Sequence, residues 1–475
     1  MNLIVNHSST ALRISFAAHA GISISIPEND RYSSGTMMPG RRRMTGFSLL
    51  VEVDEALEVV KSNISIAPPE VEFVTLEEAV GRVTGRDVVA PFDVPSFDRS
   101  AVDGYAVQAS TTTSASSINP IELEVLGTSH AGSAPGEMIV TENGEAIELY
   151  TGSPLPRNAD AVVMAEFCKR NGKNVNVTKP VAPWQNVSRK GEDFQLGEIV
   201  VPRGRQLHGW HVGALASLNL SHVPVYRKLR VAILSTGSEL REYGQELRPG
   251  QVVNSTKPML KSIIKQRSFE AVDLGTVPDD NTEIRNALTR GLASADIILT
   301  TGGSSLGEKD LVPDVINEMG KPGLLVHGVR MRPGKPTGIA VVQGKPVFVL
   351  SGYPVAALVA FEVFVEPISD LILGIKRPPR AKILGHLTRR VTTPVGVKSY
   401  VRVKVTREPN GNFKVDPLRL TGSGILSSMT KANGILIIPE GTEGFDEEEQ
   451  VEVMLIDAIE ASNKERGLSG NSKTR

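Results

Sequence analysis

The residues with the clearest chemical potential lie in the segment 300–310, TTGGSSLGEKD, which combines glycines, hydroxyls and acids. It follows an apolar run at 295–299 and precedes an apolar pattern of helical period at 311–319, so the predicted order is strand, turn, helix. Such a turn directs backbone N–H groups and the positive end of a helix at an anion. Gly302 and Gly303 let the backbone approach that ligand closely, because they carry no Cβ.

The same turn ends in an acid, Asp310, which is unusual for an anion site. An acid beside a phosphate indicates a bridging divalent metal ion. The alternative is an acid at the start of a helix, where it stabilises the helix dipole. Both interpretations fit Asp310 taken alone.

Further acids follow two other predicted strands. Glu239 comes after the turn 235–237 in STGSEL, and Asp279 and Asp280 follow the strand 271–275. The local alternative for the two aspartates is a helix N-cap, since a helical pattern begins directly after them. Several carboxylates beside a phosphate-binding turn are what a magnesium-dependent phosphoryl or nucleotidyl reaction needs. The 8 histidines show no metal-ligand spacing, which argues against a transition-metal site held by histidines.

A second anion candidate is the basic loop 330–336, RMRPGKP, which holds three cations and two prolines. Surface cations are usually solvated, and that is the alternative here. The loop lies between two predicted strands of the ligand-binding sheet, however. Arginine and lysine in that place can hold a tetrahedral oxyanion or a phosphate.

Two polar segments stand out in the region that follows residue 90. The first is PSFDRSAVDGYAV at 95–107, and the second is the turn TGSPLP at 151–156. The candidate ligand contacts of the first segment are Asp98, Arg99, Ser100 and Asp103. The alternative is a pair of loops closed by aspartate hydrogen bonds.

Strands and helices alternate from residue 228 onwards. The expected strands are 229–234, 271–275, 295–300, 338–342 and 347–350, and the expected helices are 258–266, 281–292, 312–319 and 354–372. This succession predicts a parallel sheet covered by helices on both faces. Ligands of such sheets bind beyond the carboxyl ends of the strands, where the turns 235–237, 300–303 and 351–354 all fall. We therefore expect a ligand site at this edge.

The other segments complete a multidomain α/β chain. Residues 1–43 are expected to form a disordered N-terminal extension, for which a transit-peptide-like segment and an over-extended start are the alternatives, and 458–475 a tail. A mixed domain is expected from 44–90 and 190–226, with helices from Ser48 and over 208–220, and a strand, a helix and an extended exit over 71–90. The predicted units after it are a β-rich insert at 91–189, the α/β domain at 227–375 and a C-terminal β domain at 376–457 with a turn at 409–412.

Composition narrows the class of function. The 475 residues carry 52 Lys+Arg and 53 Asp+Glu, so no basic excess indicates nucleic-acid binding. The single cysteine, Cys168, excludes an internal disulfide framework and fits a reducing compartment. The longest apolar stretch, 347–365, is broken by Gly352, Pro354 and Glu362, which argues against a membrane span. We expect a cytoplasmic protein with no nucleic-acid or membrane partner.

Six motifs, in this order, resemble those of the molybdopterin molybdenumtransferases, the MoeA family, which are related to the E domain of gephyrin. The motifs are PSFDRSAVDGYAV, TGSPLPRNADAVVM, STGSEL, TTGGSSLGEKD, RPGKPTG and SGYPVAAL, and the similarity runs from about residue 44 to 457. The resemblance implies an enzyme with a MogA-like, parallel-sheet molybdopterin-binding domain. Its substrates would be adenylylated molybdopterin and molybdate, with AMP released in a Mg²⁺-dependent step. It also implies a homodimer formed through the discontinuous domain, a separate molybdopterin adenylyltransferase and downstream molybdoenzymes.

The resemblance assigns roles to residues of this chain. Asp280 and Asp310 would be the metal-associated catalytic acids, supported by Glu239. The phosphate or pterin would be held by Thr236, Gly302, Gly303, Ser304 and Ser305. The molybdate pocket would be lined by Arg332, Lys335 and Pro336, and completed by Arg402 and by Ser423 or Ser428 of the C-terminal domain. Asp103 and Thr151 would reach the site across the dimer interface.

Three departures from the family pattern touch the oxyanion pocket. Arg332 stands where many members have lysine, Tyr353 where asparagine is common, and Ala356 where many have serine. They leave open whether molybdate or tungstate is preferred. Two rival functions also stay open: a pterin-binding adenylyltransferase, which shares the glycine-rich turn, and a scaffold that organises partner proteins.

Overall fold

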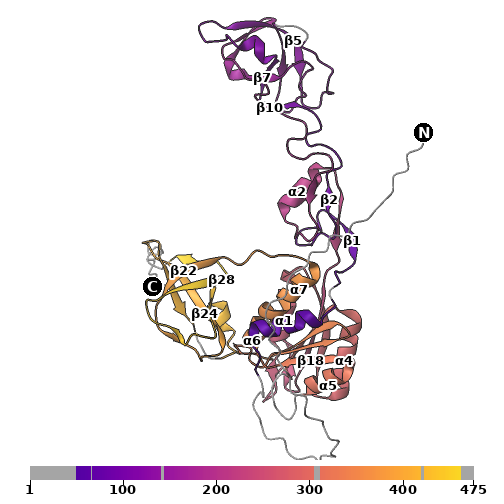
Figure 1. The fold of residues 1–475 in the computed structure, drawn as a ribbon, viewed down its shortest axis with the longest axis vertical. Coiled ribbons are helices and arrows are strands. Elements are labelled where there is room, and N and C mark those ends of the chain that lie inside the picture. Colours follow the sequence, from indigo (N-terminus) through magenta and orange to yellow (C-terminus); the bar gives the residue numbers. More distant parts are fainter. Residues whose placement is uncertain (1–49, 66, 141–143, 304–310, 419–421, 462–475) are drawn as a thin grey trace, which may run out of the picture. The chain divides into compact units, whose positions relative to one another are not determined.

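The computed structural model describes residues 50–65, 67–140, 144–303, 311–418 and 422–461. It contains a six-stranded sheet in the order β16-β13-β17-β21-β20-β18. Of these strands, β18 is labelled in Figure 1. Its strands are β13 (Arg230–Thr236), β16 (Glu270–Val277), β17 (Ile297–Thr301), β18 (Pro322–His327), β20 (Gly338–Val342) and β21 (Lys345–Leu350). The strands β16, β13, β17 and β21 are parallel neighbours, whereas β20 pairs antiparallel with β21 and β18.

The sheet is therefore mixed, and the expectation of a wholly parallel sheet is wrong at this edge. The cause lies in the two-residue turn between β20 and β21. Gln343 and Gly344 both have positive φ, 53° and 76°, which is the conformation of a tight hairpin turn. A chain that reverses within two residues must pair antiparallel with itself, and β18, which was not predicted, extends the hairpin.

Helices cover both faces of this sheet, as expected. One face carries α1 (Val53–Asn63), α3 (Thr256–Gln266), α6 (Pro354–Ala360) and α7 (Glu366–Leu373), and the other carries α4 (Asn281–Ser294) and α5 (Leu311–Met319). Successive side chains of β13 point to opposite faces of the sheet and belong to two hydrophobic cores. Val231 and Ile233 pack on the first face, and Ala232 and Leu234 pack on the second. Burial on both faces explains why the strand is apolar throughout.

Three predicted helices differ from the expectation. The helix expected from Ser48 begins only at Val53, and Val51 before it forms a β-bridge with Val329. The one expected over 354–372 is present, but Phe361–Val365 forms a π-helical turn between α6 and α7. Pro367 explains the turn, because a proline displaces the normal hydrogen-bond pattern of the preceding residues, and the N–H of Glu366 bonds to the carbonyl of Phe361 five residues back. The helix expected within 71–90 is wrong. Successive turns lead from β1 (Val71–Thr75) through Gly81, at φ 81°, to β2 (Val88–Val89).

Strands from the two flanks of the insert pair with each other. β1 pairs antiparallel with β12 (His222–Tyr226), and β2 pairs antiparallel with β11 (Ile199–Val201). The helix α2 (Gly209–Ser217) lies inside the predicted range 208–220. Buried side chains of these elements form a core of their own, which includes Val74, Leu207, Leu215 and Val223.

The insert is a β structure, as expected. Its six-stranded sheet has the order β7-β4-β6-β5-β9-β8. The strands are β4 (Gly104–Val107), β5 (Ile121–Ser129), β6 (Glu145–Leu149), β7 (Ala161–Met164), β8 (Cys168–Asn171) and β9 (Asn174–Val177), and β3 (Arg99–Ser100) pairs with β10 (Val187–Ser188). Gly104 is required where β4 meets β7, because a Cβ there would lie 1.9 Å from the carbonyl oxygen of Val163.

The C-terminal region also forms a sheet, here of seven strands. They are β19 (Met331–Arg332), β22 (Lys382–Leu387), β24 (Lys398–Arg407), β25 (Phe413–Pro417), β26 (Gly434–Ile438), β28 (Gln450–Leu455) and β29 (Glu460–Ala461). The turn predicted at 409–412 is confirmed, since it joins the antiparallel pair β24 and β25. β19 belongs to the basic loop 330–336 and pairs in parallel with β24, so this sheet holds the loop.

Candidate functional site

Three turns meet at the carboxyl ends of the parallel strands, as the sequence predicted. Gly302, at the end of β17, packs so closely on Thr236, at the end of β13, that a Cβ would lie 2.4 Å from the Thr236 carbonyl oxygen. Gly352, after β21, approaches Gly302 to 3.8 Å, measured from the position of an ideal Cβ on Gly352 to the Gly302 Cα. The hydroxyl of Thr256 donates to the carbonyl of Gly352 at 2.6 Å and fixes that turn.

The floor of this junction is shaped for a ligand that approaches the backbone. Gly302 and Gly303 have φ of 90° and 60°, a region that favours glycine. The hydroxyl of Thr236 is buried beneath them and has no hydrogen-bond partner among the described residues. Such a group is costly unless a ligand, a water or another residue satisfies it. The predicted ligands Ser304 and Ser305 lie outside the described residues.

Of the acids predicted at this edge, Asp280 and Glu239 are among the described residues and Asp310 is not. Asp280 caps α4, where its Oδ1 accepts hydrogen bonds from the backbone N–H groups of Thr282 and Glu283 at 2.9 and 3.0 Å. The local N-cap interpretation is therefore confirmed, and its role as a metal-associated acid stays a prediction. The carboxylate of Glu239 lies 2.9 Å from the position of a Cβ on Gly237. Asp310 is outside the described residues, and those residues hold no cluster of three potential metal ligands.

Lys257 is a buried lysine that the sequence analysis did not single out. It holds in place residues 238–254, the segment that contains Glu239. Lys257 is 5% exposed in the first turn of α3. Its ammonium donates to Glu242 at 2.5 Å and to Thr276 at 3.2 Å, and lies 3.5 Å from Asp273. The bonds from Lys257 and Thr276 hold the pKa of Glu242 below its usual value against the effect of burial. These contacts tie residues 238–254 to β16.

Replacing Lys257 by methionine is expected to lower the free energy of unfolding by about 1 to 3 kcal/mol, because it removes the ammonium partner of Glu242 and one of two ammonium partners of Asp273, whose carboxylates are 37% and 36% exposed. Urea unfolding would measure the change in free energy. Hydrogen exchange would show that the backbone amides of residues 238–254 exchange faster than in the wild type. Lys261→Met is the matched control, since Lys261 is more exposed and bonds only to Asp273 among the described residues, at 3.0 Å. Equal effects of the two substitutions would contradict the role assigned to Lys257.

Two arginines predicted at the site lie close enough for the charge of one to act on the other: Arg332 on the basic loop and Arg402 on the C-terminal sheet. Arg402, on β24, is 3% exposed; its Nη1 donates to the carbonyl of Tyr400 at 3.1 Å and its Nε to the hydroxyl of Ser428 at 3.3 Å. Burial lowers the pKa of Arg402, and the positive charge of Arg332 lowers it further. Both groups therefore occupy a setting in which an anion is favoured.

The other predicted members of this pocket lie on the basic loop and on the segment 422–428. Lys335 is exposed and Pro336 half-buried, and the basic loop is closed by the bond from the Val329 N–H to the Lys335 carbonyl at 2.9 Å. The carbonyl of Ser423 accepts from the N–H of Val355 at 3.0 Å, which joins the segment 422–428 to the start of α6. This segment ends in the short helix α8 (Ser427–Thr430). Of the two serines considered, Ser428 is the one in contact with Arg402.

In the insert, the two residues predicted to reach across a dimer contact each other. The carboxylate of Asp103 accepts from the N–H and the hydroxyl of Thr151, at 2.7 and 2.8 Å. These two bonds hold the pKa of Asp103 below its usual 3.8, with the backbone bond as the larger cause. Asp98 likewise accepts from the N–H of Lys190 at 2.7 Å. The alternative of loops closed by aspartate hydrogen bonds is thus confirmed for both aspartates.

Thr151→Val is expected to raise the pKa of Asp103 towards 3.8, but not to it, because the larger, backbone bond remains. Because the pKa of Asp103 is lowered in the folded protein, the stability that its ionised carboxylate contributes is fully present above about 3.8 and is lost as the pH falls through the lowered pKa. Carboxyl-carbon NMR titration would measure the pKa. Thr178→Val removes a hydroxyl that bonds to the Phe167 carbonyl instead, and serves as the control. An unchanged pKa in Thr151→Val would contradict the assignment.

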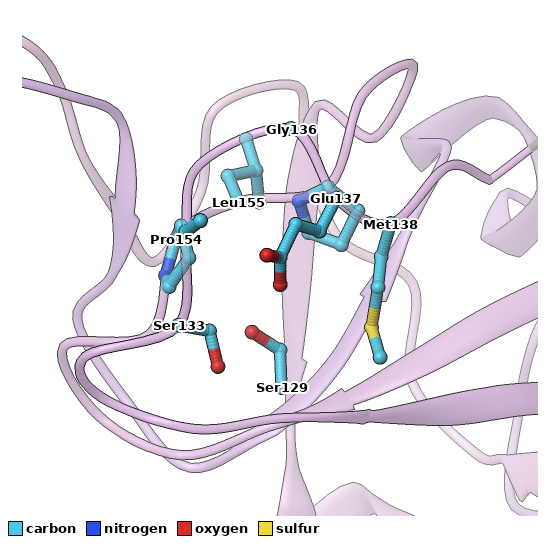
Figure 2. Close-up of a pocket in the computed structure, with 9 residues that line it drawn as sticks. Ser129, Ser133, Gly136, Glu137, Met138, Pro154 and Leu155 are labelled. Carbon is cyan, nitrogen blue, oxygen red and sulfur yellow. The ribbon is translucent and has the colours of Figure 1, made fainter.

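A small pocket lies beside the turn 151–156 (Figure 2). Figure 2 shows the carboxylate of Glu137 directed towards the hydroxyl side chains of Ser129 and Ser133, with Pro154 on one side of it and Met138 on the other. The cavity measures about 20 Å³, which is room for one water molecule. It is too small for a nucleotide or a pterin and is part of the internal packing of the insert.

Family models match three stretches of the chain. They describe the MoeA N-terminal region (domain I and II) at residues 51–219, a probable molybdopterin binding domain at 232–370 and the MoeA C-terminal region (domain IV) at 385–456. A putative molybdopterin biosynthesis protein of Methanocaldococcus jannaschii is 38% identical over 395 residues, which cover 82% of this chain and 92% of that protein. The chain belongs to the MoeA family. The resemblance drawn from its six motifs is thereby confirmed.

Other relatives and a solved structure agree with the MoeA assignment. Molybdopterin molybdenumtransferase of Bacillus subtilis is 33% identical, with 82% of this chain and 90% of that protein covered. A molybdopterin molybdenumtransferase 2 of Mycobacterium tuberculosis is 35% identical, with 77% and 90% covered. The crystal structure of the molybdopterin biosynthesis MoeA protein of Pyrococcus horikoshii is 36% identical, matches with a TM-score of 0.74 and covers 86% of this chain and 100% of that chain. The multidomain fold class with a MogA-like sheet domain is confirmed. Within the described part of this MoeA chain, no helix has the length and apolar character to cross a membrane.

Proposed function

We propose that this MoeA-family protein is a molybdopterin molybdenumtransferase that acts in molybdenum cofactor biosynthesis. The names of the Bacillus and Mycobacterium relatives support the proposal. The observation that carries it is the combination of a glycine-lined cradle at Thr236, Gly302 and Gly303 with the buried guanidinium of Arg402. A reaction between adenylylated molybdopterin and molybdate needs both, because it must hold a phosphoanhydride and a metal oxyanion together.

Different residues of this chain would bind the two substrates. The close backbone and the buried Thr236 hydroxyl would receive the phosphate or pterin end. Arg402 and Arg332 would hold the oxyanion, whose negative charge would offset both the burial and the repulsion from Arg332 that lower the pKa of Arg402. A pocket prepared in this way stabilises charge without reorganising during the reaction. The dithiolene sulfurs would then replace oxygens of molybdate, which leave as water, and hydrolysis of the phosphoanhydride would release AMP and leave the other phosphate on molybdopterin.

Magnesium, when bound, would offset the negative charge of the anhydride from which AMP leaves. Mg²⁺ is commonly held by one or two carboxylates, with phosphate oxygens and water completing its shell. Asp280 would be one ligand, because both of its cap bonds use Oδ1 and leave Oδ2 for a cation. Asp310 is proposed from its sequence position as the second, and Glu239 would support them.

The proposal includes the assembly and the partners. The protein would be a cytoplasmic homodimer in which the Asp103–Thr151 contact of one subunit faces the cradle of the other. A separate molybdopterin adenylyltransferase would supply the adenylylated substrate, and downstream molybdoenzymes would receive the product.

The decisive experiment is AMP release from adenylylated molybdopterin, with molybdate and tungstate titrated in parallel and with Mg²⁺ either present or chelated. The proposal expects oxyanion-stimulated release that chelation abolishes, and the more effective oxyanion identifies the metal. If neither oxyanion stimulates release although the pterin still binds, the protein is a binding module or scaffold instead. Sedimentation of the same preparation tests the dimer.

A further inference from the structure

An exposed aromatic side chain stands in the middle of the candidate site. Tyr353 is 62% exposed, in the turn between β21 and α6. The backbone of the residue is fixed, since its N–H donates to the hydroxyl of Ser351 at 3.2 Å and its carbonyl accepts from the N–H of Ala357 at 3.0 Å. The side chain makes no helix-capping bond. The turn therefore does not need this aromatic ring for its own structure.

The position of Tyr353 joins the two halves of the site. Its neighbour Gly352 lies against Gly302 of the cradle, as described above. On its other side the ring packs on Gly424, where a Cβ would lie 3.0 Å from the ring carbon Cδ1. Gly424 belongs to the segment 422–428, whose end in α8 carries Ser428, the partner of Arg402. The ring is thus placed between the phosphate cradle and the oxyanion pocket.

We propose that Tyr353 is a substrate-binding and specificity-determining residue, whose ring stacks on the pterin portion of the substrate. The inference rests on the proposed function. In adenylylated molybdopterin the phosphoanhydride joins adenosine to the pterin, and the pterin side bears the dithiolene that receives the metal. A residue between the phosphate cradle and the oxyanion pocket therefore faces the pterin, and adenine lies beyond the phosphate. Stacking of an aromatic side chain on a planar heterocycle strengthens binding by about 10- to 100-fold.

Three variants separate the ring from the hydroxyl and from the turn. Tyr353→Phe keeps the ring and is expected to bind molybdopterin within about 3-fold of the wild type, whereas Tyr353→Leu is expected to bind it about 10- to 100-fold more weakly. Gly424→Ala places a methyl group 3.0 Å from the ring and shifts it, so it is expected to weaken binding only when Tyr353 is present. Phe73→Leu is the control, because Phe73 is also 62% exposed but lies on β1.

The measurement is direct binding of molybdopterin by pterin fluorescence, beside binding of AMP by calorimetry, with no turnover required. Loss of molybdopterin affinity in Tyr353→Leu with AMP affinity unchanged supports the inference. Equal molybdopterin affinity in wild type and Tyr353→Leu overturns it, as does a loss confined to AMP. A wild-type protein that binds no molybdopterin would instead overturn the proposed function, so the two failures are distinguishable.

Discussion

Asp280→Asn is expected to lower Mg²⁺-dependent AMP release by about 100-fold while α4 stays folded. Asparagine and aspartate are equally good N-caps, so the bonds to the N–H groups of Thr282 and Glu283 survive and only the negative charge is lost. Rates measured over a range of Mg²⁺ concentrations should show a higher Mg²⁺ requirement in the variant. Circular dichroism melting should show an unchanged midpoint.

Two further substitutions make this result specific. Asp280→Ala removes cap and charge together, and is expected to lose the same activity and about 1 kcal/mol of stability in addition. Asp279→Asn removes a charge one residue away and is expected to keep activity close to that of the wild type. Full activity with an unchanged Mg²⁺ requirement in Asp280→Asn would show that Asp280 acts only as a helix cap.

Asp280 also shows how far a local pattern can be interpreted. The sequence predicted both an N-cap and a metal-associated acid at this position, and the structure confirms the cap without deciding the second role. The two are compatible, because one carboxylate oxygen serves the helix and the other is left for a cation. A pattern in neighbouring residues determines the local bond, whereas a role in the site depends on groups that are distant in the chain.

Periodicity predicted the parallel part of the sheet well, and with it the meeting of the three turns. Strands that are apolar throughout and alternate with helices can bury both faces in few other ways. The antiparallel edge was missed because Gln343 and Gly344 form a tight hairpin that periodicity does not report. Pairing of β19 with β24 was missed for a different reason, since Met331 and Lys398 are far apart in the sequence and become neighbours only in the folded chain.

The structural role of Lys257 could not be predicted from the sequence. A lysine in the first turn of a helix is ordinarily solvated, and its pattern gave no reason to consider it. Its carboxylate neighbours, Glu242 and Asp273, come from other elements on either side of it in sequence. Arg402 was named only through family resemblance, and its burial beside Ser428 became visible only in the folded protein.

Molybdate and tungstate are each expected to raise the midpoint of thermal unfolding, and Arg402→Leu is expected to abolish the rise. A ligand that binds only the folded protein stabilises it by about 2.7 kcal/mol at 100 times its dissociation constant. Arg402 contributes a buried guanidinium in a setting that disfavours its charge, because burial and Arg332 both lower its pKa. An oxyanion offsets that cost, so the shift reports the occupied pocket. Differential scanning fluorimetry at constant ionic strength would measure it.

The variants at this position separate charge from geometry. Arg402→Lys keeps the charge but replaces a planar fork by a point donor, and is expected to retain only part of the shift. Arg407→Leu removes an exposed arginine from the same strand and is expected to retain all of it. If oxyanions stabilise wild type and Arg402→Leu equally, they bind elsewhere, and the assignment of the pocket fails. A larger shift with tungstate than with molybdate would mean that the pocket holding Arg402 and Arg332 selects tungstate.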